Sequence, residues 1–241
     1  MSSKIRLHFS KELKANLLSN LSNEQSHYIK NVMRLKIGDT ISLFNSSNGE
    51  WSAKIVNYNK GSIEFKVEKI IKTKKIEQDI WLAFSPIKKN PLEMMIQKTT
   101  ELGIQKFFPI LSERTVVKEI NIERVKKIIV EASEQSNRIS VPEIEKLQPL
   151  KNFLDKFPNN GSLIFCDINC HRSDLKNILA KKNHGPICIL VGPEGDFSEK
   201  ERQSIIEKKE IFSLSLAKNI LRAETAAIAS VTIVNYHLNL N

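Results

Sequence analysis

The fold is decided by Ile189–Ser198, with the sequence ILVGPEGDFS, in a chain of 241 residues. This segment predicts the end of a buried strand, a turn with two glycines and one proline, and the start of a helix. Glycine allows positive φ angles and the close approach of a ligand, because it carries no Cβ atom. The helix N-terminus would add unpaired N–H groups that attract acceptor groups. The spacing of the two glycines matches neither a dinucleotide-binding fingerprint nor a phosphate-binding loop. The segment indicates a ligand-binding loop, with an ordinary connecting turn as the alternative.

A second informative stretch, Leu214–Ala227 (LSLAKNILRAETAA), also follows a strand-like run and leads into an apolar helix. Arg222 and Glu224 lie in the connection. In α/β sheets, polar residues at the ends of strands are where ligands usually bind. The alternative is an exposed ion pair, which would contribute less than about 1 kcal/mol to stability.

Outward from these two stretches, short apolar runs alternate with helical patterns from residue 73 onward. Nearly continuous apolar runs are typical of strands covered on both faces, as in a parallel α/β sheet. The expected strands span 80–84, 107–111, 163–168, 187–191 and 211–216. Helices are expected at 90–102, at 121–136 and after the capping box of Ser198–Glu201.

The first 72 residues have a different pattern, in which apolar and polar side chains alternate over 40–44, 51–58 and 62–71. Closely spaced strands with turn signals between them predict a small β-barrel or sandwich. We therefore expect two domains, 1–72 and 73–241.

The charge is concentrated in the smaller domain. The whole chain carries a net charge of +10, and residues 1–72 contain twelve Lys and Arg against six Asp and Glu. This asymmetry favours a module that contacts nucleic acid, with a solvated lysine-rich surface as the alternative. The sequence shows no secretory segment and no apolar run of membrane-spanning length, and its three cysteines are an odd number. We therefore expect a reduced, cytoplasmic protein. Cys166 and Cys170 lack a second pair of metal-ligating residues at finger spacing, so no metal site is expected.

The segments GPEGDFS (Gly192–Ser198) and ILRAETA (Ile220–Ala226) together resemble the bacterial 16S ribosomal RNA (uracil-N3)-methyltransferase family of the SPOUT superfamily. Three residues depart from the family pattern: Asp196 replaces a usual glycine, and Ala217 and Asn219 replace glycine and arginine. Further matching segments are spread in order over the chain: Arg6, His27–Asp39, Lys98–Gly103, Pro109–Arg114, Glu131–Arg138 and Val141–Glu143.

This resemblance implies a fold and a cofactor. The fold would be a PUA-like RNA-binding β-barrel followed by a SPOUT α/β domain with a deep C-terminal trefoil knot, assembled as a homodimer. The cofactor would be S-adenosylmethionine, held in the loops of the knot. The implied cofactor-binding residues are Leu111, Leu190, Gly192, Pro193, Glu194, Gly195, Leu214, Leu216, Ile220, Leu221, Thr225 and Ala226.

The implied substrate is a specific uridine of 16S ribosomal RNA, within the 30S subunit or its precursor, methylated at N3. Two alternatives stay open: a SPOUT methyltransferase that acts on transfer RNA, 23S RNA or a ribose 2′-OH, and a non-catalytic RNA-binding factor of ribosome assembly. Arg6, Lys30, Arg34 and Lys36 would hold RNA phosphates.

Methylation at N3 requires loss of the N3 proton, which predicts a base and a stabilising cation. Glu224 and Arg222 are the first choices for these roles. Glu194 and Arg138 are the alternative base and the alternative stabiliser. A second interpretation is that Glu224 only orients Arg222 or a loop amide.

Overall fold

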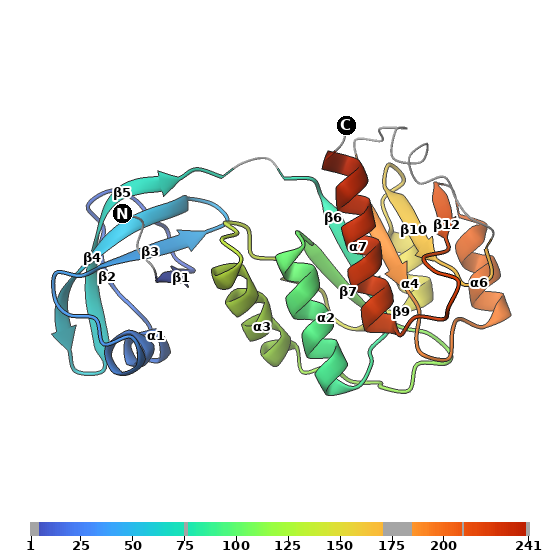
Figure 1. Cartoon of the computed structure of the whole chain (residues 1–241), viewed down its shortest axis with the longest axis horizontal. Helices are drawn as coiled ribbons and strands as arrows, with labels where there is room; N and C mark the ends of the chain where they lie inside the picture. The colour runs from blue at the N-terminus through green and yellow to red at the C-terminus, as the bar shows by residue number, and fades with distance from the viewer. Residues whose placement is uncertain (1–4, 75–76, 171–184, 209, 240–241) are drawn as a thin grey trace. The chain divides into compact units, whose positions relative to one another are not determined.

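The computed structural model describes residues 5–74, 77–170, 185–208 and 210–239, and the chain divides into two compact units (Figure 1). The first unit contains the described residues before Glu77 together with Ser133–Val141. The second unit contains Glu77–Ala132 and the described residues from Pro142 onward. The expected division at residues 72 and 73 placed Ser133–Val141 in the second domain, and the structure places it in the first.

The first unit is built on a five-stranded sheet in the order β1-β3-β4-β5-β2. Strand β1 pairs parallel with β3, and the other pairs are antiparallel. The alternation expected in 62–71 is present: Ile63, Phe65 and Val67 are buried in the core, and Lys66 is exposed. The strands are β1 (Arg6–His8), β2 (Leu18–Asn20), β3 (Thr40–Asn45), β4 (Gly49–Asn59) and β5 (Ser62–Lys72).

The sequence patterns did not predict β1, β2 or the short helical segment before β3. Helix α1 (Asn23–His27) begins at a capping box made by Ser22 and Gln25 and continues into a π-helical turn, Tyr28–Val32. Three-residue strands are too short to show an alternation, so only their hydrogen-bonded partners define them.

Arg6 joins Ser133–Val141 to the first unit. Its Nη1 donates hydrogen bonds of 3.0 Å to the carbonyl oxygens of Ser133 and Glu134, and its Nη2 donates one of 2.6 Å to that of Arg138. Its Nε lies 3.1 Å from Oε2 of Glu50, and the two side chains are 8% and 9% exposed. The guanidinium therefore serves internal contacts. The expectation that Arg6 contacts RNA stays a prediction, and these internal contacts do not support it.

The second unit contains a seven-stranded sheet in the order β12-β10-β11-β6-β7-β8, with β9 paired to β7. All its pairings are parallel. On one side of β6 lie β7 and its partners β8 and β9, and on the other side lie β11, β10 and β12 in that order. The strands are β6 (Ile80–Phe84), β7 (Lys106–Leu111), β8 (Glu143–Ile144), β9 (Gln148–Pro149), β10 (Ser162–Cys166), β11 (Ile187–Val191) and β12 (Ile211–Leu214).

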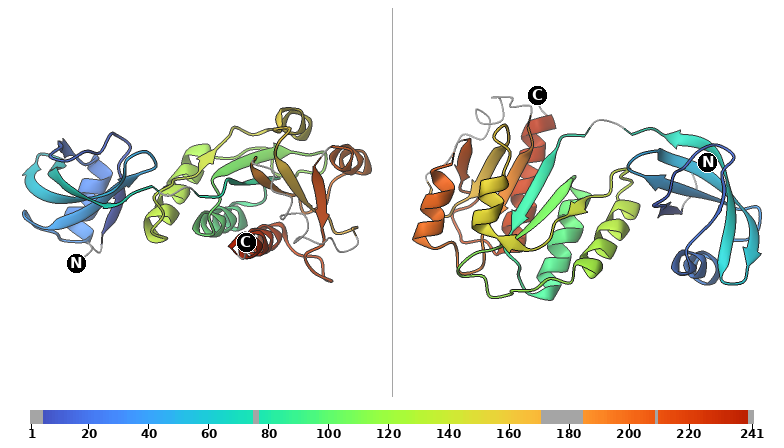
Figure 2. Two further views of the ribbon diagram at one scale, coloured as in Figure 1. Left: turned by 90° about the horizontal axis from the view of Figure 1, so that it is seen from above. Right: turned by 180° about the vertical axis from the view of Figure 1, so that it is seen from behind.

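Helices cover both faces of this sheet, as the continuous apolar runs predict. Helices α2 and α7 lie side by side on one face, and α4 and α6 lie on the other (Figure 2). On the second face, Phe153 of α4 and Ile205 of α6 share a core with Phe165 and Leu190 of the sheet. The helices are α2 (Lys89–Glu101), α3 (Ile122–Gln135), α4 (Leu150–Lys156), α6 (Glu199–Ile206) and α7 (Ala223–Asn239).

The α/β class, the PUA-like first domain and the parallel sheet are confirmed. The trefoil knot concerns how the chain threads through itself, which strand order does not report, so it stays a prediction. Within the described ranges, every helix is too short or too polar to span a bilayer.

We expect Glu50→Gln to lower the free energy of unfolding of the first unit by about 3 kcal/mol, because it leaves the buried Arg6 guanidinium without its counter-charge. Urea unfolding followed by the fluorescence of Trp51, on strand β4, measures this change. Glu12→Gln is the control, since Glu12 pairs with Lys14 at 3.2 Å with both side chains more than half exposed. Its effect should stay below about 0.5 kcal/mol. Equal losses in the two variants would contradict the prediction.

Candidate active site

A cavity of about 600 Å³ lies at the carboxyl ends of four neighbouring strands, β12, β10, β11 and β6. This is the edge of a parallel sheet at which ligands bind, and the volume is that of a site for a small organic molecule. Every described residue of its lining belongs to the second unit. The lining residues are Lys88, Pro91, Cys166–Ile168, Val191–Glu194, Asp196, Leu214–Ala217, Asn219–Glu224 and Ala226.

The loop between β11 and α6 forms one wall of the cavity, and the buried Phe197 ring holds it in place. A Cβ atom on Gly192 would lie 2.9 Å from this ring, which packs edge-on against Phe165 at 5.5 Å between centroids. Gly192 is therefore required for packing within the loop. Gly195 does not line the cavity among the described residues, and its carbonyl oxygen accepts a hydrogen bond of 3.0 Å from Arg114. The close approach of a ligand, which motivated both glycine assignments, stays a prediction, and the structure adds a packing reason for Gly192.

Asp196, the residue that replaces a family glycine, has a φ angle of +59°. Its Oδ1 accepts a hydrogen bond of 2.8 Å from the N–H of Phe197. Asp and Asn tolerate this left-handed conformation better than other residues with a Cβ atom, because their short polar side chains bond locally. The departure from the family pattern therefore preserves the shape of the turn.

The loop between β12 and α7 forms the opposite wall and is mainly apolar. Leu214, Leu216, Ile220 and Leu221 line the cavity, and the Ile220 side chain is 83% exposed. An exposed aliphatic side chain at a cavity mouth gives an apolar surface that a ligand can cover.

Two charged residues with different surroundings lie next to this loop. Arg222 lines the cavity and is exposed to solvent, whereas Glu224, also in the lining, is only 7% exposed. Glu224 lies in the first turn of α7, where the helix dipole stabilises a negative charge. Among the residues that the structure describes, none donates a hydrogen bond to its carboxylate. Since Glu224 lines the cavity, its carboxylate can take a proton or a hydrogen bond from a ligand there.

Cys166 also lines the cavity, but burial raises the pKa of its thiol to about 12. The thiol is therefore protonated near neutral pH and is a poor nucleophile. In the described part of the chain, no three His, Cys, Asp or Glu side chains gather as metal ligands would.

The structure brings together most of the cofactor-binding residues predicted from sequence. Gly192, Pro193, Glu194, Leu214, Leu216, Ile220, Leu221 and Ala226 line the cavity, together with Arg222 and Glu224. Four predicted residues are absent from the described lining. Leu190 is fully buried inside β11, and Leu111 ends β7, which lies outside the four strands of the cavity. Gly195 and Thr225 are exposed on the loop and on α7.

Arg138, the alternative stabiliser, lies in the first unit and not in the cavity lining. It is 8% exposed, and its Nη2 donates a hydrogen bond of 2.9 Å to Oγ of Ser140. Lys30, Arg34 and Lys36 are exposed on the same unit, as residues that contact RNA must be.

Several lining residues were not found from sequence, above all Lys88 and Asp167. Lys88 follows β6, and Asp167 follows β10 directly. The signal that could have found them is their position after strands of the same parallel sheet, since all carboxyl ends of such strands open on one edge.

Comparison with known proteins gives the family. The model for an RNA methyltransferase domain matches residues 74–235, and the model for the PUA domain of RNA methyltransferases matches residues 21–68. Ribosomal RNA small subunit methyltransferase E of Rickettsia conorii is 36% identical over 213 residues, which cover 87% of this chain and 86% of that protein. Ribosomal RNA small subunit methyltransferase E 2 of Borreliella burgdorferi is 32% identical over 85% of both chains.

The solved structures agree with these matches. The crystal structure of ribosomal RNA small subunit methyltransferase E from Neisseria gonorrhoeae, bound to S-adenosyl methionine, superposes with a TM-score of 0.86 at 27% identity. The superposition covers 96% of this chain and 97% of the other. Since the matches extend over both units in order, the chain belongs to the ribosomal RNA small subunit methyltransferase E family of RNA methyltransferases.

Proposed function

We propose that this protein transfers a methyl group from S-adenosylmethionine to N3 of a specific uridine in 16S ribosomal RNA. The observation that carries the proposal is that an exposed cation, Arg222, and a largely buried glutamate, Glu224, line the same cavity. The named relatives, which are methyltransferases of the small subunit RNA, support the choice of substrate.

The residues of the cavity fit the cofactor. Backbone groups of Val191–Glu194 on one wall would bind its polar parts, and the apolar side chains Leu214, Leu216 and Ile220 on the other would cover its flat ring. The Glu224 carboxylate has acceptor capacity that no described protein group uses. When bound, the cofactor supplies a methyl group on a positively charged sulfur.

The protein groups would manage the nucleophile. Glu224 accepts the N3 proton of uracil, and Arg222 stabilises the negative charge that spreads onto the neighbouring carbonyl oxygens. Direct displacement of the methyl group needs little else from the protein than alignment of the reacting atoms. The competing role for Glu224 is to orient Arg222, and the two roles differ in their dependence on pH.

RNA binding would involve the exposed cations of the first unit. Lys30 lies in the π-helical turn, with its Nζ 5.7 Å from the centre of the Tyr58 ring, and Arg34 and Lys36 follow it closely. Contacts from such residues to phosphates position RNA without reading its sequence. The homodimer, the 30S particle as substrate and the cytoplasmic location follow from the family resemblance and belong to the same proposal.

The proposal is tested by mapping methylated uridine in the 16S RNA of a strain that lacks this protein. We expect one 3-methyluridine to disappear and to return when the wild-type chain is supplied. Arg222→Ala should lower the single-turnover rate by about 10²–10³-fold, because it removes a group that stabilises charge in the transition state. Lys218→Ala is the matched control, since Lys218 is an exposed cation of the same loop outside the described lining. Methylation of 23S or transfer RNA instead would favour a SPOUT methyltransferase with a different RNA substrate. Absence of both methylation and cofactor binding would favour a non-catalytic RNA-binding factor of ribosome assembly.

Glu224→Gln separates a base from an orienting acceptor. Glutamine keeps the shape of the side chain and removes its basicity. If Glu224 takes the proton, the single-turnover rate of the variant should rise about tenfold per pH unit below the pKa of uracil N3, because the deprotonated fraction rises by that factor. Quench-flow rates between pH 6 and 9 measure this slope. A deficit relative to wild type that stays constant over this range would show that Glu224 orients and does not accept the proton.

Replacing Lys30, Arg34 and Lys36 together by glutamine should weaken RNA binding and reduce its salt dependence. Each lost phosphate contact lowers the slope of log affinity against log salt by about 0.7–0.9, so we expect a change of about 2–3. Fluorescence anisotropy with a labelled 16S fragment measures the slope. The control replaces three other exposed lysines of the same unit, Lys11, Lys66 and Lys69. An equal change in both triple variants would mean that the affinity reflects overall charge rather than this segment.

A further inference from the structure

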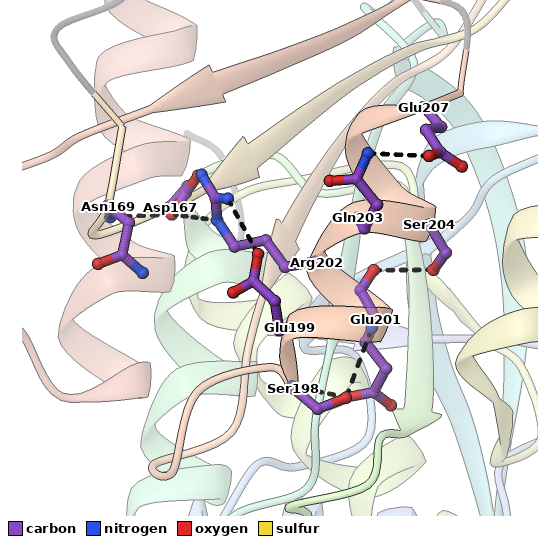
Figure 3. A network of polar contacts seen from close by, with 9 residues as sticks. All are labelled: Asp167, Asn169, Ser198, Glu199, Glu201, Arg202, Gln203, Ser204 and Glu207. Atoms are coloured by element: carbon purple, nitrogen blue, oxygen red, sulfur yellow. Dashed lines mark hydrogen bonds and ion pairs between the residues drawn. The ribbon is translucent and has the colours of Figure 1, made fainter.

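A buried carboxylate lies at the end of β10, in the wall of the cavity, and has no part in the chemistry above. Asp167 follows β10 directly, and its side chain is only 2% exposed. Its Oδ2 accepts a hydrogen bond of 2.9 Å from Nη2 of Arg202, and its Oδ1 accepts one of 2.9 Å from the N–H of Asn169 (Figure 3).

Asp167 is connected to both loops that form the cavity. Arg202 lies on α6, the helix that directly follows the Val191–Ser198 loop, so the carboxylate holds the far end of that loop. The N–H of Asp167 donates a hydrogen bond of 3.1 Å to the carbonyl oxygen of Leu214, where the opposite loop begins. Asp167 thus connects the start of the loop between β12 and α7 to the helix that follows the loop between β11 and α6.

The other polar contacts described for α6 do not lead to β10. The Ser198 hydroxyl and the Glu201 side chain form a capping box inside the first turn (Figure 3). Oε1 of Glu201 also accepts a hydrogen bond of 2.8 Å from the N–H of Glu113, after β7. Ile205 packs into the core. Apolar packing thus holds α6 against the body of β10, and the ion pair with Asp167 is the described polar contact between α6 and the end of that strand.

Arg202 and Asp167 differ in burial, and breaking their ion pair is costly because Asp167 is the more buried of the two. The Arg202 side chain is 24% exposed and can be hydrated without its partner, whereas the Asp167 carboxylate is almost fully buried. A buried charge that loses its partner is strongly destabilised, so the helix cannot move away from β10 at low cost. Among the described residues, Arg202 is the cation that pairs with the Asp167 carboxylate.

We propose that Asp167 is a positioning residue of the cavity, and that its ion pair with Arg202 holds the two cofactor loops at the separation that S-adenosylmethionine binding requires. This inference rests on the proposed function, because it assumes that the cavity binds this cofactor. Neither residue takes part in methyl transfer.

The test is a double-mutant cycle of Asp167→Asn and Arg202→Met, with the dissociation constant for S-adenosylmethionine measured by calorimetry on the full chain. We expect each single variant to raise the constant about tenfold or more, with the larger effect for Arg202→Met, which strands the buried carboxylate. The double variant should lose no more than Arg202→Met alone, because both changes break the same contact. In these variants kcat at saturating S-adenosylmethionine should stay within about threefold of wild type, and the loss should appear as a higher KM for S-adenosylmethionine. Arg202→Lys, which keeps the cation, should recover most of the affinity.

The control cycle uses Glu93→Gln and Arg124→Met. These residues form a similar two-point pair, with distances of 3.2 and 3.0 Å, between α2 and α3 of the same unit and outside the described lining. Cofactor affinity should change less than about twofold in this cycle. Circular dichroism identifies variants that fold, and if Asp167→Asn does not fold, the partly exposed Arg202 carries the test through Arg202→Met and Arg202→Lys.

Two results would overturn the inference: unchanged affinity in folded variants of Asp167 or Arg202, or losses that simply add in the double variant. Failure of the proposed function is distinct, since in that case the wild-type chain itself would not bind S-adenosylmethionine.

Discussion

The candidate site depends on one constraint, the parallel pairing of β12, β10, β11 and β6. Parallel strands have all their carboxyl ends at one edge of the sheet, so the loops that follow them must meet there. Segments as distant in sequence as Lys88, Asp167, Glu194 and Arg222 thereby line one cavity. Because helices cover both faces of the sheet, this edge is where its backbone and side chains can reach a ligand.

Much of this arrangement could be predicted from local patterns. The runs at 80–84 and 187–191 match β6 and β11 to the residue, because strands buried on both faces must be apolar at every position. The runs 163–168 and 211–216 were too long, since Ile168 and Leu216 are apolar residues that line the cavity instead of extending a strand. An apolar residue in a ligand site has the same local pattern as one in a core.

What could not be predicted depends on partners far apart in the chain. Arg6 binds the carbonyl oxygens of residues 127 to 132 positions away, and nothing near Arg6 in sequence distinguishes it from a surface cation that contacts RNA. The same holds for Asp167, whose partner Arg202 lies 35 positions on, beyond β11. The packing reason for Gly192 could not be predicted either, because the clash that an added Cβ atom would cause is with the Phe197 ring of its own loop.

The return of Ser133–Val141 to the first unit has a consequence for the order of events during synthesis. Arg6 emerges from the ribosome long before its carbonyl partners, which lie at least 127 residues later. At about 5–20 residues per second, the gap lasts roughly 6–25 seconds. Once β5 has been made, a nascent sheet of β1 to β5 would still lack the carbonyl acceptors of Arg6 for the rest of this interval. The first unit therefore cannot be completed when its own five strands have been made, and over half the chain must be made before its last native contacts can form.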